Sequence, residues 1–94
     1  MIEVKRENSQ VFTVVVNEED SKREYTVTLD DDYHQHLTAG KRPKEELIEA
    51  SFEFLLKREP KESILRQFNL KVINRYFPEF EREIHRQLKG KEHG

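Results

Sequence analysis

The stretch Asp30–His36 is the part of this 94-residue chain where side chains capable of chemistry are densest: three aspartates and two histidines within seven positions. Carboxylates and imidazoles are ligands that zinc accepts. If the stretch is helical, however, His34 and His36 point roughly 200° apart and do not chelate one ion together. Asp30 and His34 have the i, i+4 spacing, but two ligands do not make a site. We therefore expect a capped helix with solvated histidines, and neither a metal site nor another cofactor.

Catalytic motifs are missing from the sequence. It contains no cysteine, no GxSxG and no HExxH, and its three glycines do not form a phosphate-binding loop. Most carboxylates fall on polar faces, where they keep the chain soluble. Ser51 is the one hydroxyl that invites comparison with a nucleophile, but it is better explained as a small residue at a close helix contact. The sequence therefore predicts that the protein is not an enzyme.

Length and charge restrict the class of protein further. Ninety-four residues make a single domain, which we expect to span 1–94. The net charge of −2 is unevenly divided: residues 1–32 carry four basic and nine acidic side chains, and residues 33–94 carry thirteen and ten. No apolar run approaches the roughly 18 residues of a membrane span or resembles a signal peptide. The expectation is a soluble protein of the cytoplasm without a membrane partner, and no feature indicates a small-molecule ligand.

The first third of the chain has the pattern of β-strands. Apolar and polar residues alternate at the start, and the run 11–17 is rich in β-branched residues on both of its faces, as in a central strand. The run 23–29 alternates again and is expected to pair with 11–17 as an antiparallel hairpin. The predicted sheet has two or three strands within residues 1–29.

Residues 30–88 are predicted to be helical. Asp30 is the expected N-cap of a short helix that Gly40 ends, and Pro43 begins a second helix that reaches about residue 58. A short helix over Lys61–Phe68, a helix after the cap Asn69 and a last helix follow, with a frayed tail at 89–94. The predicted fold class is α+β: a small N-terminal antiparallel sheet packed on one face against three to five C-terminal helices.

The helix at 43–58 has a wider apolar surface than an ordinary surface helix. Its apolar residues cover an arc of roughly 200°, where a stripe of about 100° is usual. This predicts cover from two directions, by the sheet and by either the C-terminal helices or a second copy of the chain. The side chains predicted to lie at an interface are Leu47 and Phe54 on this helix and Tyr76 and Phe80 beyond it.

A resemblance to a DNA-binding family rests on residues 25–59, YTVTLDDDYHQHLTAGKRPKEELIEASFEFLLKRE. One strand followed by two helices resembles ribbon-helix-helix repressors, in which strands of two chains pair and enter the major groove. The resemblance implies that Glu24, Thr26 and Thr28 face the bases. It also implies that three basic residues lie near phosphate, namely Lys41, Arg42 and Lys44.

The distal segment ESILRQFNLKVINRYFPEFEREI is similar to the ends of a family of small bacterial proteins of unknown function, a similarity that transfers no site. From these observations the primary hypothesis is a non-catalytic binding or regulatory module that acts through protein–protein contacts or as a homodimer. The alternative is a DNA-binding regulator or antitoxin of the ribbon-helix-helix kind.

Overall fold

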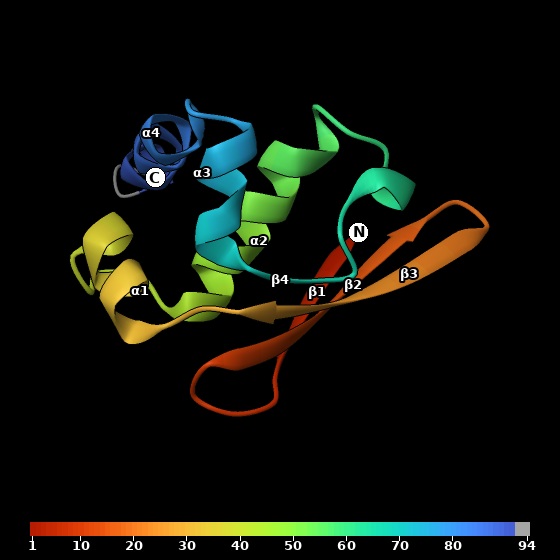
Figure 1. The fold of residues 1–94 in the computed structure, drawn as a ribbon, viewed down its shortest axis with the longest axis horizontal. Coiled ribbons are helices and arrows are strands. Elements are labelled where there is room, and N and C mark those ends of the chain that lie inside the picture. The colour runs from red at the N-terminus through yellow and green to blue at the C-terminus, as the bar shows by residue number, and fades with distance from the viewer. Residues whose placement is uncertain (92–94) are drawn as a thin grey trace.

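The computed structural model describes residues 1–91 of the chain. In these residues a meander of strands comes first and helices follow (Figure 1). The elements are β1 (Ile2–Arg6), β2 (Val11–Glu18), β3 (Ser21–Thr28), α1 (Asp31–Thr38), α2 (Lys44–Leu56), the 3₁₀ turn η1 (Lys61–Ser63), β4 (Gln67–Asn69), the 3₁₀ turn η2 (Leu70–Val72), α3 (Ile73–Tyr76) and α4 (Phe80–Lys91).

The sheet has four strands in the order β1-β2-β3-β4. The first three pair antiparallel in sequence order, with Val14 of β2 opposite Val4 of β1 and Tyr25 of β3. The predicted hairpin of residues 11–17 and 23–29 is therefore confirmed. The fourth strand is a correction to the predicted two or three, since β4 lies parallel to β3 at the far edge, with Phe68 opposite Val27.

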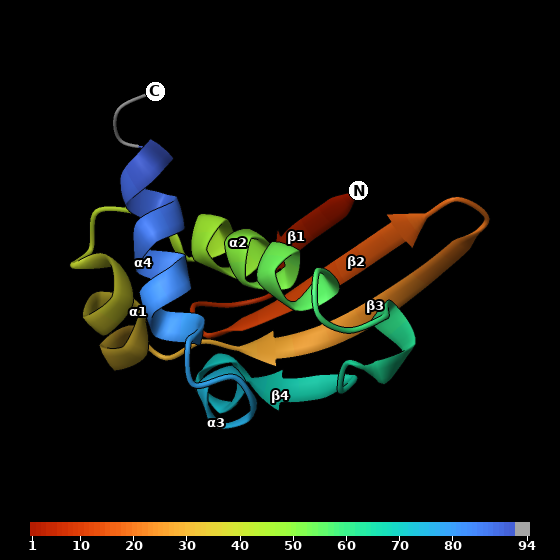
Figure 2. The same cartoon turned by 90° about the horizontal axis from the view of Figure 1, so that it is seen from above.

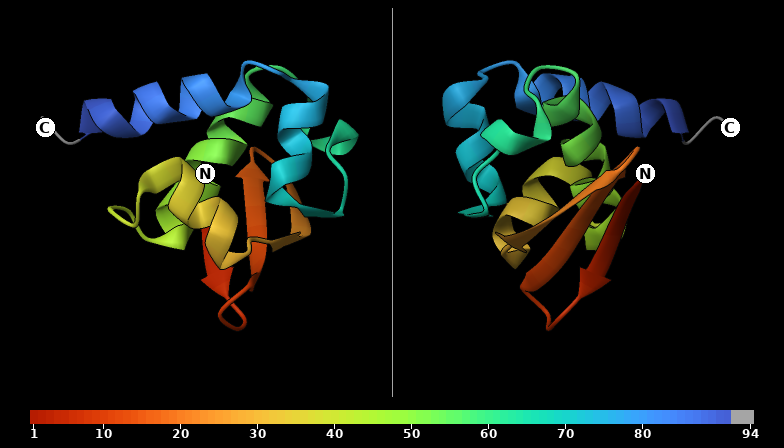
Figure 3. Two further views of the ribbon diagram at one scale, coloured as in Figure 1. Left: turned by 60° about the vertical axis from the view of Figure 1, so that its left-hand side comes forward. Right: turned by 90° about the vertical axis from the view of Figure 1, so that its right-hand side faces the viewer.

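The helices cover only one face of the sheet, as predicted (Figure 3). Because side chains alternate across a strand, Phe12, Val14 and Val16 of β2 point toward the helices and are fully buried. On the opposite face Thr13 is half-buried and its neighbour Thr26 on β3 is exposed. We call this second surface the open face of the sheet.

The prediction of a helix over Lys61–Phe68 is wrong. Only a single 3₁₀ turn forms after Pro60, and the chain then extends into β4. The amide of Thr26 in β3 donates to the carbonyl of Arg66, which fixes the extended path. The ring of Phe68 packs 6.0 Å from Phe52 of α2. Tertiary pairing with a neighbouring strand thus outweighs the local helical spacing of Ile64, Leu65 and Phe68.

Helix α2 lies between the sheet and the C-terminal helices, and this position explains its wide apolar surface (Figures 1 and 3). Phe52 points toward the sheet, with its ring 5.2 Å from that of Tyr25. Phe54 points the other way, with its ring 5.9 Å from that of Phe77 and 5.1 Å from that of Phe80. The second cover of this helix is supplied by the same chain.

The ends of the helices follow the predicted capping residues with one exception. The Asp30 carboxylate accepts from the amide of Tyr33, and α1 ends in left-handed conformations at Ala39 and Gly40, with φ of 54° and 73°. The side chain of Asn69 accepts from the amide of Lys71 at the start of η2. The exception is the tail predicted to fray from residue 89. The backbone of α4 instead stays helical to residue 91, and 92–94 lie outside the described residues.

Candidate functional site

The aspartates and histidines that open the first helix do not converge on one point, and Asp31, His34 and His36 each contact a different partner. The side chain of His34 donates from Nε2 to the carbonyl of Arg42 at 2.5 Å. His36 lies one turn from Tyr33, and both contact the Glu81 carboxylate of α4, at 3.3 Å and 2.9 Å. Burial, with the neighbouring Glu81 charge, raises the pKa of the Tyr33 phenol, which therefore stays a donor. Among residues 1–91, no three His, Cys, Asp or Glu side chains are grouped so as to hold a metal ion.

Lys44 does not have the position that phosphate binding requires. It is buried, and its ammonium donates at 2.6 Å both to the Ser9 carbonyl and to the Asp31 carboxylate. These contacts join the β1–β2 turn, α1 and α2. The hydrogen bond from Lys44 lowers the pKa of Asp31, so this carboxylate stays ionised as the partner of the buried ammonium. The prediction of Lys44 as a contact to nucleic acid is therefore wrong.

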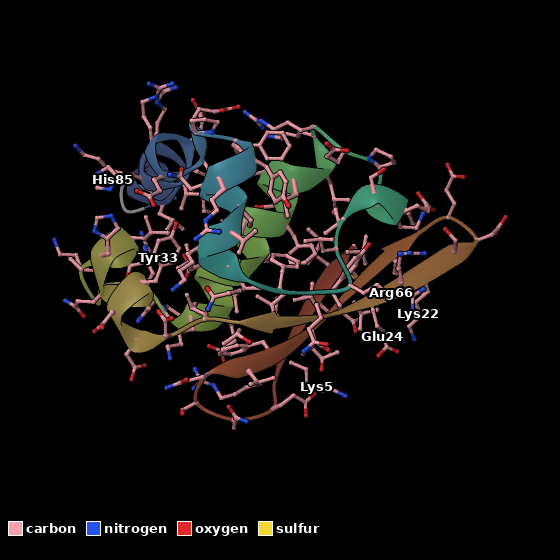
Figure 4. The ribbon with its side chains drawn as sticks, viewed as in Figure 1. Lys5, Lys22, Glu24, Tyr33, Arg66 and His85 are labelled. Atoms are coloured by element: carbon pink, nitrogen blue, oxygen red, sulfur yellow. The ribbon has the colours of Figure 1, made fainter. Side chains whose placement is uncertain are left out.

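The other residues assigned by resemblance to DNA binding lie on different parts of the molecule. Thr26 and Thr28 point to the open face of the sheet, and Glu24, labelled in Figure 4, lies on that face too. Lys41 and Arg42 are in the loop between α1 and α2. The stretch of β3 that carries the two threonines is paired with β2 on one side and β4 on the other, so it offers no free edge to the strand of a second chain.

Three of the four predicted interface residues belong to the core of the single chain. Leu47 and Phe80 are fully buried and Phe54 is 3% exposed. They cannot contact another molecule without unfolding, so their assignment to an interface is corrected. Tyr76 differs from them, since 67% of its surface is exposed.

Tyr76 flanks an apolar groove that we regard as the candidate functional site. The groove has a volume of about 250 Å³. Its lining residues come from the end of α2, the extended segment before β4, and the turn formed by η2 and α3. Figure 2 shows how these elements are arranged. Leu65, 52% exposed, flanks it as well. The residues that line it are Leu55, Glu59, Ser63, Ile64, Leu65, Phe68, Val72, Ile73, Tyr76 and Phe77.

The groove exists because the chain between α2 and α4 is not one continuous helix. Pro60 follows the end of α2, the pairing of β4 with β3 holds residues 67–69 at the edge of the sheet, and the residue after α3, Phe77, packs against Phe54 of α2. Buried Leu55, Ile64 and Ile73 bring apolar surface to the groove, and Glu59 is its only charged residue. Such a surface is mainly apolar and is suited to contact an apolar group.

Reasoning from the sequence identified Tyr76 but not Leu65 or the groove. Leu65 lies in the segment predicted as a helix that does not form, so its exposure was not foreseen. A weak signal was Ser63, because serine side chains compete for backbone hydrogen bonds and disfavour helix interiors.

Comparisons with protein-family models, with curated proteins and with solved structures find no match to this chain. Within the described residues, none of the helices has the length and apolar character needed to cross a membrane.

Proposed function

We propose that this chain is a non-catalytic binding module that holds a short apolar segment of a partner protein in the groove flanked by Leu65 and Tyr76. The observation that carries the proposal is the exposure of these two side chains. Apart from Met1, they are the large hydrophobic residues most exposed in the part of the chain that the structure describes. Clustered apolar exposure of this kind is typical of surfaces that bind other proteins.

The composition of the groove supports an apolar anchor as the occupant. A Leu, Ile or Phe side chain inserted between Tyr76 and Leu65 would contact Ile64 and Ile73 on leaving water. Full burial of such a side chain contributes roughly 1.5–3 kcal/mol. Two or three anchors would give the moderate affinity that suits a reversible regulatory contact.

The size of the groove favours a short segment over a second copy of the chain. Stable interfaces use about 20–30 residues on each side, and ten line this groove. The wide apolar arc of α2 no longer supports a homodimer, because Phe52 and Phe54 are covered from within.

The absence of catalysis stays part of this proposal. The Ser51 hydroxyl is fully buried and donates at 2.7 Å to the Leu47 carbonyl of its own helix, a local structural contact. The ribbon-helix-helix alternative lacks comparable support, because β3 has neighbours on both sides where Thr26 and Thr28 lie. A location in the cytoplasm stays a prediction from the sequence.

Selection of peptides from a displayed random library tests the proposal. The immobilised chain should enrich peptides with two or three closely spaced apolar residues, with dissociation constants of about 1 µM to 1 mM. Leu65→Asp should weaken the selected peptides at least tenfold, about 1.4 kcal/mol. Lys22→Glu on the open face of the sheet is the control and should leave them unchanged. Failure to enrich any peptide, or enrichment of peptides insensitive to Leu65→Asp, would contradict the proposal.

A further inference from the structure

The longest dimension of the molecule extends 36 Å. The turn between β2 and β3 carries Glu18, Glu19 and Asp20 at one end (Figures 1 and 2). At the other end lie the acidic first turn of α1 and two basic segments, the α1–α2 loop with Lys41 and the C-terminal half of α4 with Lys89. We call the part that holds Lys41 and Lys89 the basic end, and an anionic partner would approach it in preference to the β2–β3 turn.

A recess at this basic end has the lining of an anion site. It has a volume of about 240 Å³ and lies between the end of α1, the following loop and α4. Its charged and titratable lining residues are His36, Lys41, Arg42, His85 and Lys89, and among residues 1–91 no acidic side chain lines it. His85 is labelled at this end in Figure 4. Two carboxylates contact lining residues from outside the recess: Glu81 accepts from Tyr33 and His36, and Glu46 lies 3.5 Å from Arg42.

Arg42 gives a second, independent indication of a ligand. Its Nη2 donates to the Leu88 carbonyl at 3.2 Å near the end of α4, and its Nη1 lies 3.5 Å from the Glu46 carboxylate. The third nitrogen, Nε, is buried and has no hydrogen-bond partner among the described residues, a condition shared only with the Nε of Arg23 on β3 in that part of the chain. An unsatisfied buried donor is uncommon and costly in folded proteins. An anion in the recess would supply the missing acceptor after a small shift of the side chain.

The positive charge continues from the recess along the exposed side of α4. Arg82, Arg86 and Lys89 are exposed, and with His85 they have the i, i+3, i+4, i+7 spacing that places them on one face. Arg86 also lies 3.4 Å from the Glu83 carboxylate of the same helix. At 1.5 Å per residue they extend over roughly 10 Å. This is longer than one phosphate group, so the pattern suits a linear polyanion better than a small anion.

We propose that this end of the molecule binds the phosphate backbone of a nucleic acid without reading its sequence. Lys41, Arg42 and Lys89 hold one phosphate in the recess, and the exposed cations of α4 contact the phosphates that follow it. A membrane surface fits less well, because the apolar residues of α4, Phe80, Ile84 and Leu88, are buried in the core and cannot insert among lipids. This surface shares Lys41 and Arg42 with the ribbon-helix-helix one but uses α4 in place of β3.

Fluorescence anisotropy with the full chain and labelled oligonucleotides of mixed sequence tests the proposal. Single- and double-stranded RNA and DNA of about 20 nucleotides are titrated at about 50 mM and about 200 mM salt. We expect binding that weakens steeply with salt and depends little on sequence. Lys41→Glu with Lys89→Glu should weaken it at least about tenfold.

Lys5→Glu with Lys22→Glu is the matched control, because it changes net charge equally on the open face of the sheet, where Figure 4 labels both lysines. The control should change the affinity for nucleic acid by less than about twofold. Leu65→Asp should also change this affinity by less than about twofold, because Leu65 belongs to the groove and not to the basic end. Three results would overturn the proposal: no binding at the lower salt, equal losses in both double variants, or binding to vesicles of phosphatidylserine and phosphatidylcholine with none to nucleic acid.

Discussion

Lys44 illustrates how single side chains hold this small domain together. Its ammonium has lost most of its contact with water, and three segments contribute to its surroundings: the Ser9 carbonyl, the Asp31 carboxylate and the first turn of α2. A buried ammonium is tolerated only when it is paired and hydrogen-bonded. The exposed Asp31 therefore matters more for stability than its position on the surface suggests.

Asp31→Asn should lower the urea midpoint of unfolding at neutral pH, because it removes the charge that faces the buried ammonium of Lys44. The folded-state pKa of Asp31 is lowered, so its contribution to stability is complete above the ordinary aspartate pKa of about 3.9. That contribution is lost as the pH falls below this value, through the lowered folded pKa. Urea unfolding followed from neutral to acid pH should show the difference between variant and wild type shrinking.

Asp32→Asn is the control for this pair, since it makes the same charge change on the next residue of the same helix. A destabilisation that is equal in the two variants, or one that stays constant as the pH falls, would show that the contact with Lys44 is not its source.

Phe54 and Leu65 allow a direct comparison between core and groove. Phe54→Ala should cost about 3–5 kcal/mol of unfolding free energy because Phe54 packs against both Phe77 and Phe80. Leu65→Asp should change it by no more than about 0.5 kcal/mol because the side chain is half in water. Chemical denaturation measures both. A large loss in Leu65→Asp would mean that this leucine supports the fold and that its exposure carries no function.

At the level of elements, the sequence predicted those parts of the fold whose local and tertiary preferences agree. Strands β2 and β3, the Asp30 cap and the last helix were all foreseen. Each has a period or a capping residue that matches its final environment. The wide arc of α2 correctly predicted two covers, although composition left open whether the second came from the same chain.

The part that could not be predicted is the connection between α2 and α4. Strand β4 forms because β3 has an unpaired edge beside it, and three residues in a parallel pair leave no periodic signal. The groove depends on that connection, because the extended segment before β4 and helix α3 form two of its walls. Local spacing around Ile64, Leu65 and Phe68 favoured a helix, and the long-range pairing with β3 decided otherwise.

Amide hydrogen exchange should separate the strands by their pairing. Central β2 is paired on both sides over most of its length and buries Phe12, Val14 and Val16. Its amides should exchange close to the rate set by global unfolding, whereas those of β4, three residues long and at the edge, should exchange through local opening. Amides of β4 as slow as those of β2 would contradict this ranking and would indicate that the groove wall is part of the cooperative core.

At the scale of the whole molecule, a single chain covers its own hydrophobic core. The sheet and the C-terminal helices enclose α2 from both sides, and the two surfaces that we propose for partners are the groove and the basic end. These two surfaces are built from different elements, so each can be altered without the other. A binding module with one apolar and one anion-binding surface could join a protein segment to a nucleic acid.

The solution mass should equal that of one chain, 11.4 kDa, at low micromolar concentration. The reason is that the apolar residues of α2 that suggested a dimer are covered internally, and the groove is too small for a stable symmetric interface. Light scattering coupled to size-exclusion chromatography gives this mass. A value near twice 11.4 kDa would restore the homodimer, and sensitivity of that dimer to Leu65→Asp would then place a second copy in the groove.

Photo-crosslinking from position 76 in the cells that make the protein is the most direct test of the groove as a partner site. A photoreactive phenylalanine analogue replaces Tyr76 with little change of shape, and the same analogue at Lys22 on the open face of the sheet is the control. We expect one defined adduct from position 76 that disappears in a Leu65→Asp background, and no such adduct from position 22. No adduct from position 76, or the same adducts from both positions, would contradict the assignment of the groove.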